Sequence, residues 1–277
     1  MVREHLGAGG MGDVYRVGKY NSPEEFALKQ VVRKPEYTES DWQKIRHRFC
    51  FEVKNLARID HPNVVKFIDF QDDGDQLCLL MEYIKGMTID QCLQFKSFRL
   101  DEILFIARRI CRGLVALHQE GIIHRDLSTR NVLLADDRVV LIDFGISFEQ
   151  NVQHRITRPG GLLGSPAYMA PERISNHPQS SAIDQYSLGI LLFIMVTGES
   201  PFQGSFHEVL AKHLFQPAPN ILECLQPGQV NDTWLALADI IETCLQKSPR
   251  KRFPSVLELQ AALEAIGATT PEWSVAA

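Results

Sequence analysis

Apolar and polar positions alternate in short runs along the first third of the chain. Runs rich in β-branched and aromatic residues cover 14–17, 26–32, 64–70 and 76–82, and turn-forming residues separate the last two. This alternation predicts strands. Between the second and third runs, apolar residues recur at helical spacing up to position 59, which predicts one helix beginning near Ser40, with Gln43 completing a capping box. The pattern therefore predicts a mainly antiparallel sheet carrying one helix.

The pattern becomes helical after an extended, glycine-ended connector at 83–86. Apolar residues at helical spacing predict helices at 103–117, 183–197 and 232–245, and a last helix that begins at Ser255 with Glu258 in a capping box. The helix at 183–197 is apolar nearly all round and is expected at the centre of its lobe. The fold class is thus α+β with two lobes, an N-lobe at 1–82, a hinge at 83–86 and a C-lobe at 87–268, followed by a tail at 269–277.

Two short apolar runs, 132–134 and 139–142, are joined by Asp136-Asp137 and predict a β-hairpin. Asp126 and Asn131 precede this hairpin and Asp143 follows it, so all three are expected to converge. A carboxylate able to accept a hydroxyl proton would then lie beside an amide and a carboxylate suited to Mg²⁺, which prefers oxygen ligands. For any one residue an ordinary loop position is the simpler interpretation. The three together, at these spacings, favour phosphoryl transfer.

A glycine-rich segment, Gly7-Ala8-Gly9-Gly10-Met11-Gly12, lies near the start of the chain. In a dinucleotide-binding fold a helix should follow such a segment. Here a strand pattern follows at 14–17, and no helix can begin before 21–23. The segment is therefore expected at the tip of a hairpin, where glycines let backbone amides approach phosphates.

Lys29 lies between apolar neighbours in the strand pattern at 26–32. Such a lysine is more often an edge residue whose amine reaches water. The following helix changes that expectation, because Glu52 lies at the border of its apolar face and is expected to point toward the sheet and pair with Lys29.

Composition narrows the function classes. The 277 residues are 45% hydrophobic and 23% charged, which suits one large domain or two packed lobes. A formal net charge of −5 gives no reason to expect nucleic acid as a partner. The six cysteines show no metal-binding spacing, no signal peptide is evident, and the most apolar stretch, 186–196, is too short for a membrane span. A cytoplasmic location is expected.

Taken together, the motifs resemble a eukaryotic-type (Hanks-type) protein kinase catalytic domain over about residues 6–265. They occur in the order of that family, and the strings G-G-M-G and G-S-P-A-Y-M-A-P-E look most like bacterial serine/threonine kinases. The matching motifs are G-A-G-G-M-G-D-V at 7–14, A-L-K at 27–29, H-P-N at 61–63, H-R-D-x-x-x-x-N at 124–131, D-F-G at 143–145, A-P-E at 170–172, D-x-Y-S-L-G at 184–189 and K-S-P-R-K-R at 247–252.

The resemblance implies an enzyme that uses ATP and Mg²⁺ to phosphorylate protein substrates. The catalytic residues that it implies are Asp126, Lys29, Glu52, Asn131 and Asp143, of which Asn131 and Asp143 hold the metal. The residues that it implies for nucleotide binding are Leu6, Gly7, Ala8, Gly9, Gly10, Met11, Gly12, Asp13, Val14, Ala27, Lys29, Met81, Glu82, Ile84 and Leu133. It further implies a buried ion pair between Glu172 and Arg252. The regulatory spine that it implies consists of Leu56, Phe67, His124 and Phe144, anchored by Asp184.

Two positions depart from the serine/threonine pattern. Ser128 stands where such kinases usually carry lysine, and Arg130 matches the tyrosine-kinase pattern. The substrate loop at 164–169 is nevertheless of the serine/threonine type, and it contacts the acceptor residue, so serine/threonine specificity is expected. Dual specificity and a nucleotide-binding pseudokinase scaffold stay open as alternatives. A small-molecule kinase is disfavoured, because A-P-E and the late arginine serve a peptide platform.

Regulation is expected to act through the segment between D-F-G and A-P-E. Arg125 offers a cation to a phosphate group on this segment. Thr157 is the best-placed acceptor for autophosphorylation and Ser147 a lesser one, whereas Ser165 is expected to support the catalytic loop. Any further input is expected from a regulatory partner or from the kinase surface.

Overall fold

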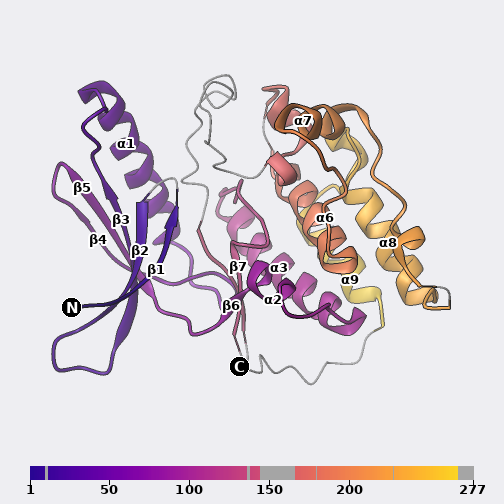
Figure 1. The fold of residues 1–277 in the computed structure, drawn as a ribbon, viewed down its shortest axis with the longest axis horizontal. Helices are drawn as coiled ribbons and strands as arrows, with labels where there is room; N and C mark the ends of the chain where they lie inside the picture. Colours follow the sequence, from indigo (N-terminus) through magenta and orange to yellow (C-terminus); the bar gives the residue numbers. More distant parts are fainter. Residues whose placement is uncertain (10–11, 136–137, 144–165, 179, 227, 268–277) are drawn as a thin grey trace.

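A five-stranded antiparallel sheet carrying one long helix forms the first part of the molecule, and helices dominate the second part (Figure 1). The computed structural model describes residues 1–9, 12–135, 138–143, 166–178, 180–226 and 228–267, except for the side chains of Ala8, Gly9, Arg48 and Glu52. The sheet is antiparallel, as expected, and its strands pair in the order β1-β2-β3-β5-β4. Their bounds are β1 Val2–Gly9, β2 Gly12–Gly18, β3 Glu25–Val32, β4 Phe67–Asp72 and β5 Gln76–Glu82.

Helix α1 spans Glu39–Leu56 and packs one apolar face against the sheet; Ile45, Phe49 and Val53 on this face are buried. The helix begins one residue before Ser40, and the predicted capping box of Ser40 and Gln43 was wrong. Thr38 is the N-cap, and its hydroxyl oxygen accepts a hydrogen bond from the backbone N–H of Asp41 at 3.1 Å. This hydroxyl satisfies a donor of the first turn that would otherwise lack a partner.

The strand predicted at 64–70 begins three residues later, at Phe67. The two valines before it pair instead with the hairpin of the second lobe. The N–H of Val65 donates to the carbonyl of Leu141 at 3.0 Å, and Val64 forms an isolated parallel bridge with the same residue. Both valines are at most 3% exposed. Because both are β-branched and fully buried, the sequence could not distinguish pairing with the second lobe from pairing with β5.

The chain leaves β5 at Glu82 and runs without regular structure through 83–86, which we call the hinge. Its far end lies close to the second lobe at Gly86. A Cβ atom added at Gly86 would lie 2.3 Å from the carbonyl oxygen of Leu134, closer than any real contact. Only glycine therefore fits where the hinge meets the second lobe.

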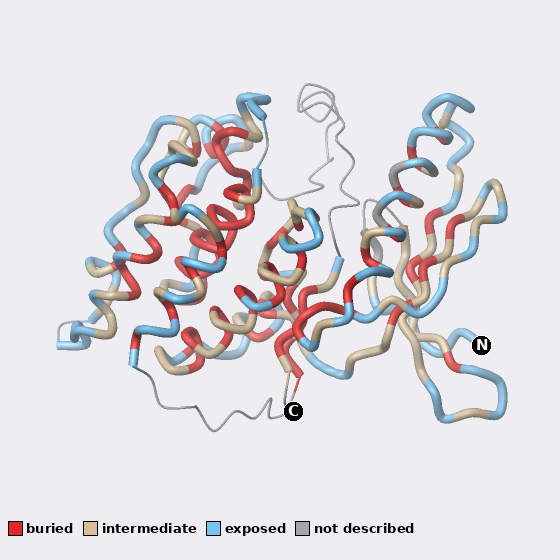
Figure 2. Tube along the Cα trace, turned by 180° about the vertical axis from the view of Figure 1, so that it is seen from behind, coloured by how far each residue is buried: buried red, intermediate tan, exposed pale blue. Residues whose placement is uncertain are grey.

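The second lobe is built around α6, spanning Ala182–Thr197, which is buried along most of its length (Figure 2). The predicted hairpin is present as β7 and β8, with Val132 opposite Leu141. Strand β6 joins its edge. Neither β6 nor helices α2 and α7 were predicted. The bounds are β6 Met87–Thr88, α2 Ile89–Leu93, α3 Leu100–Gln119, β7 Val132–Leu134, β8 Val139–Leu141, η1 Pro166–Tyr168, α5 Pro171–Ile174, α7 Phe206–Phe215, η2 Ile221–Cys224, α8 Asp232–Cys244, η3 Pro249–Lys251 and α9 Val256–Ala265. Among the described helices, none has the length and apolar character needed to cross a bilayer.

Candidate active site

The loop that precedes β7 is anchored by a carboxylate of the buried helix α6. Asp184 on α6 is fully buried and accepts hydrogen bonds from the backbone N–H groups of His124 at 2.9 Å and Arg125 at 2.8 Å. Nε2 of His118 on α3 lies 2.7 Å from the same carboxylate. Burial alone would raise the pKa of Asp184, but the hydrogen bonds, first that from His118, hold it below its usual value. The fixed anchor positions this loop relative to the lobe's core.

Asp126 and Asn131 are hydrogen-bonded to each other across this loop. Nδ2 of Asn131 donates to the Asp126 carboxylate at 3.0 Å and to the Asp126 carbonyl at 2.7 Å. Both of these bonds use the amide nitrogen, which leaves the amide oxygen for a ligand. Burial raises the pKa of the Asp126 carboxyl, and the nearby negative charge of Asp143 raises it further.

Asp143 lies two residues after the end of β8, in a left-handed backbone conformation with φ of 62°. Its side chain is 44% exposed and accepts a hydrogen bond from Nζ of Lys29, whose side chain is only 6% exposed. The lysine comes from β3 in the first lobe, so this ion pair joins the two lobes. The partner predicted for Lys29 was Glu52, whose side chain lies outside the described residues.

The donor set around Asp143 suits a hard divalent cation. It offers a half-exposed carboxylate at Asp143 and the side-chain amide oxygen of Asn131. The backbone carbonyl of Asn131 accepts a hydrogen bond from the N–H of Ile142 at 2.9 Å, which fixes Asn131 beside Asp143. Oxygen ligands that leave room for water and phosphate match the preference of Mg²⁺. These two residues are the ones that could hold the metal.

The glycine-rich segment joins β1 to β2, as the sequence predicted for a hairpin. Gly9 pairs with Gly12 at the end of the ladder, and Gly10 and Met11 lie outside the described residues. Gly12 has φ of 133°, and an added Cβ would lie 1.9 Å from the carbonyl oxygen of Gln30. The backbone here approaches β3 so closely that a side chain has no space.

The remaining candidate nucleotide residues lie on the sheet, the hinge and β7. Met81 is buried, and the backbone N–H of Glu82 donates to the carbonyl of Lys66 at 3.0 Å. Leu133 is half-buried between two fully buried neighbours, so it faces away from the core of the second lobe. The others are half-buried or exposed on the first lobe or in the hinge: Leu6, Gly7, Asp13, Val14, Ala27 and Ile84.

A polar chain that the sequence did not reveal connects the substrate loop to the catalytic loop. The hydroxyl groups of Tyr168 and Thr129 lie 2.9 Å apart, and the Thr129 hydroxyl donates to the carboxylate of Asp90 on α2 at 3.0 Å. Nε of Arg130 lies 3.5 Å from the same carboxylate, and the arginine side chain remains 73% exposed. Threonine and aspartate are common in loops, so no sequence signal marked this chain of contacts.

The predicted ion pair between Glu172 and Arg252 is confirmed. Two hydrogen bonds of 2.6 and 2.9 Å join their side chains, which are 5% and 0% exposed. Of the predicted spine, Leu56 and His124 are buried and Phe67 packs against the same core. Phe144 lies outside the described residues, and so do the other segment residues predicted to regulate or support the site, namely Ser147, Thr157 and Ser165.

Comparison with known proteins agrees with this geometry. Serine/threonine-protein kinase PknJ of Mycobacterium tuberculosis is 32% identical over 282 residues, which cover 98% of this chain and 46% of PknJ. PkaA of Streptomyces coelicolor, also named a serine/threonine-protein kinase, is 34% identical over 96% of this chain and 49% of its own length. This chain thus spans about half the length of these curated relatives.

The fold has a solved counterpart as well. The crystal structure of the Mycobacterium tuberculosis PknI kinase domain matches with a TM-score of 0.72 and 27% identity, over 96% of this chain and 95% of that chain. The family described as the protein kinase domain matches residues 1–263. The chain therefore belongs to the protein kinase domain family, among relatives named as serine/threonine kinases.

Proposed function

We propose that this chain is a serine/threonine protein kinase that transfers the γ-phosphoryl group of ATP to hydroxyl groups of protein substrates. The observation that carries the proposal is a convergence of four groups from two lobes. Asp126, Asn131 and Asp143 meet around the hairpin, and Lys29 reaches them from β3. A base, two metal ligands and a cation at one place are what phosphoryl transfer requires.

These contacts support the following catalytic roles. Asp126 accepts or orients the substrate hydroxyl, and the amide of Asn131 fixes its carboxylate. Asn131 and Asp143 would hold Mg²⁺, which neutralises charge on the phosphoryl oxygens when bound. Lys29, nearly buried, carries its cation to the α- and β-phosphates. Most of the rate enhancement then comes from positioning and from charge placed where it develops in the transition state.

Adenine recognition is assigned to the hinge and the surfaces above and below it. The N–H of Glu82 already donates to the carbonyl of Lys66, so we assign the Glu82 carbonyl oxygen, rather than its N–H, to the adenine amino group. Ile84 offers the next backbone group. Val14 and Ala27 lie on one side of the ring and Leu133 on the other.

Serine/threonine specificity is supported by the substrate loop and by the names of the relatives. Tyr168 of this loop is hydrogen-bonded to Thr129 of the catalytic loop, and this contact supports a peptide platform next to the catalytic loop. Arg130 keeps dual specificity as the second candidate.

Regulation by autophosphorylation at Thr157 is part of the proposal, and so are a regulatory partner and a cytoplasmic location. Arg125 lies beside Asp126 and supplies the cation that a phosphate group would meet. A Thr157→Ala protein should lose activity and the corresponding phosphopeptide in mass spectrometry. Full activity in that variant, with no phosphate found at Thr157 in the wild type, would refute this mechanism.

The central experiment is a radiolabelled ATP assay with Mg²⁺ on the wild type and on Asp126→Asn, followed by phosphoamino-acid analysis. Label on serine and threonine that disappears in the variant supports the proposal. Label on tyrosine as well would support dual specificity. Nucleotide binding without transfer to the protein or to generic substrates would support a pseudokinase scaffold instead.

A further inference from the structure

Two consecutive residues, where β5 ends and the hinge begins, each contact one arginine, and the two arginines come from different lobes. Glu82, the last residue of β5, meets Arg138, which directly precedes β8. Tyr83, the first hinge residue, meets Arg16 on β2. The sequence motifs did not draw attention to either arginine, and neither touches the catalytic loop through any bond described above.

The contact between Arg138 and Glu82 is bidentate. Nη1 and Nη2 of the arginine lie 2.9 and 3.0 Å from the two carboxylate oxygens. The same guanidinium donates to the carbonyl of Pro62 at 3.1 and 3.2 Å. One carboxylate oxygen also accepts the backbone N–H of Lys66 at 2.9 Å. Glu82 is therefore held both by a backbone group of its own lobe and by an arginine of the other lobe, in the geometry that gives guanidinium–carboxylate pairs their directional strength.

Electrostatics supports an ionised Glu82 in this position. Its side chain is 22% exposed, and burial by itself would raise the pKa of the carboxyl. The hydrogen bonds from Arg138 and from the Lys66 N–H outweigh burial and keep the pKa below its usual value. The pair is thus present as an ion pair at neutral pH.

Arg16 reaches the hinge from the face of the sheet that carries Lys29. In the register of β2 and β3, Val14 lies opposite Lys29 and Arg16 opposite Ala27. Alternate residues of a strand share a face, and so do cross-strand partners. Arg16 therefore lies on the face that carries Lys29, and its guanidinium is 4.8 Å from the ring centre of Tyr83.

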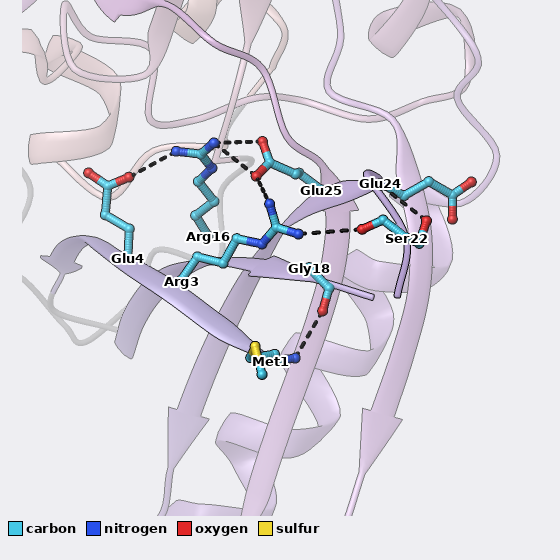
Figure 3. A network of polar contacts seen from close by, with 8 residues as sticks. All are labelled: Met1, Arg3, Glu4, Arg16, Gly18, Ser22, Glu24 and Glu25. Atoms are coloured by element: carbon cyan, nitrogen blue, oxygen red, sulfur yellow. Dashed lines mark hydrogen bonds and ion pairs between the residues drawn. The ribbon is translucent and has the colours of Figure 1, made fainter. Parts of the chain in front are cut away.

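A charged network holds the guanidinium of Arg16 in place (Figure 3). Its Nη2 donates to both carboxylate oxygens of Glu25 at 2.8 and 2.7 Å, and its Nη1 donates to Glu4 at 3.3 Å. Arg3 binds Glu25 from the other side, so the carboxylate is held in turn. A cation held in this way over an aromatic face attracts it.

We propose that Arg16 and Arg138 are positioning residues for the adenine ring, because together they fix the start of the hinge whose backbone would bind it. The far end is fixed by the close approach at Gly86. A hinge that is ordered before the nucleotide arrives loses less conformational entropy on binding, so its affinity for nucleotide is higher. This inference rests on the proposed function and concerns nucleotide affinity rather than the transfer step.

The test measures the binding of fluorescent methylanthraniloyl-ADP with Mg²⁺ to the full chain, in parallel with thermal unfolding. Losing a bidentate ion pair should weaken binding about tenfold in Arg138→Ala. Losing the cation over the ring should weaken it about threefold in Arg16→Ala. Arg138→Lys should lie between the wild type and Arg138→Ala, because lysine keeps the charge but not the paired geometry.

Arg33→Ala is the matched control. The Arg33 side chain is 31% exposed, as is that of Arg138. It pairs with Glu39 at 2.8 Å and Asp75 at 3.3 Å, both in the first lobe and away from the hinge. Its affinity should stay within about twofold of the wild type. If Arg138→Ala does not fold, Glu82→Gln removes the same ion pair and keeps the backbone carbonyl.

In steady-state kinetics the hinge variants should raise KM for ATP more than they lower kcat. Affinities of both hinge variants that match the Arg33→Ala control would overturn the inference while leaving the kinase proposal intact. An equal loss of kcat with unchanged nucleotide affinity would also overturn it, because the arginines would then act on the transfer step. A wild-type protein that binds no nucleotide would overturn the proposed function, and the inference with it.

Discussion

Replacing Arg252 by methionine should cost more stability than any surface substitution in this chain. The Arg252 side chain is fully buried and forms two hydrogen bonds with the Glu172 carboxylate. It also donates to the carbonyls of Ala182 at 2.8 Å and Gln246 at 2.9 Å. One guanidinium therefore joins the A-P-E segment, the start of α6 and the end of α8.

The magnitude follows from what the substitution leaves behind. Methionine has a similar length but no donors, so the Glu172 carboxylate would remain buried without its counter-ion and the carbonyls of Ala182, Gln246 and Lys247 would lose a partner. Breaking a buried ion pair from one side costs about 3–5 kcal/mol. That is a large part of the roughly 5–15 kcal/mol by which a typical folded domain is stable. Glu172→Gln removes the charge from the other side, so the double variant should be destabilised by much less than the sum of the single variants.

Urea unfolding followed by far-UV circular dichroism measures these free energies of unfolding. The control is Arg112→Met, because Arg112 pairs with Glu264 at 3.2 Å with both side chains more than 40% exposed. An exposed pair of this kind is worth about 0–1 kcal/mol. A loss in Arg252→Met that equals the control, or single-variant losses that simply add in the double variant, would refute the argument that this pair is coupled through burial.

Three further predictions concern the substrate platform, the glycine-rich segment and pH. Thr129→Val and Tyr168→Phe should each raise the peptide KM about fivefold to tenfold, with little change in KM for ATP. Because each substitution removes the same hydrogen bond, the double variant should raise the peptide KM no more than either single variant does. Gly12→Ala should weaken nucleotide binding measured by titration, because a Cβ there meets the Gln30 carbonyl at 1.9 Å. Burial and then the charge of Arg252 lower the pKa of Lys247 from 10.5 to about 8. Between these two pH values the lysine is protonated in the unfolded chain and largely neutral in the folded one. Its contribution to the free energy of unfolding therefore rises with pH over this range. The stability of the wild type relative to Lys247→Met should therefore rise by about 1 kcal/mol from pH 7.5 to 10, after allowance for partial solvation, and a difference independent of pH would contradict the shift.

Much of the fold could be predicted because its elements are defined by local patterns. The hairpin of β7 and β8, the strand β5 and the helix α6 all lie within a residue or so of their predicted bounds. In each, the apolar spacing matches the side that is buried, so periodicity and tertiary packing give the same answer. The candidate site followed from the same source, since Asn131 and Asp143 are placed by the ends of that hairpin.

The contacts that the sequence did not reveal depend on residues whose type is compatible with several environments. Val64 and Val65 could have continued β4, but their burial against β8 draws them to the second lobe. Arg138 looks like an ordinary turn residue until the fold brings Glu82 within 3 Å of it. A single sequence carries no signal for such long-range polar pairs, because arginine, threonine and aspartate are equally suited to solvent.

The catalytic loop and Lys29, which lie in different lobes, are held in place by different kinds of contact, and the hinge connects the two lobes. Asp126 belongs to a loop anchored by Asp184 on the most buried helix, so its position is determined within one lobe. Lys29 belongs to the other lobe and meets Asp143 through an ion pair in which the carboxylate is half exposed. Solvent screens the exposed half of this pair, so the other contacts between the lobes share in fixing the distance that it spans. The covalent hinge and the contacts around it therefore also set the distance from the lysine to the catalytic loop. Among these contacts, the pair of Arg138 and Glu82 joins the residue before the hinge to the hairpin that carries the metal ligands, alongside the close approach of Gly86 to Leu134 and the hydrogen bond from Val65 to Leu141.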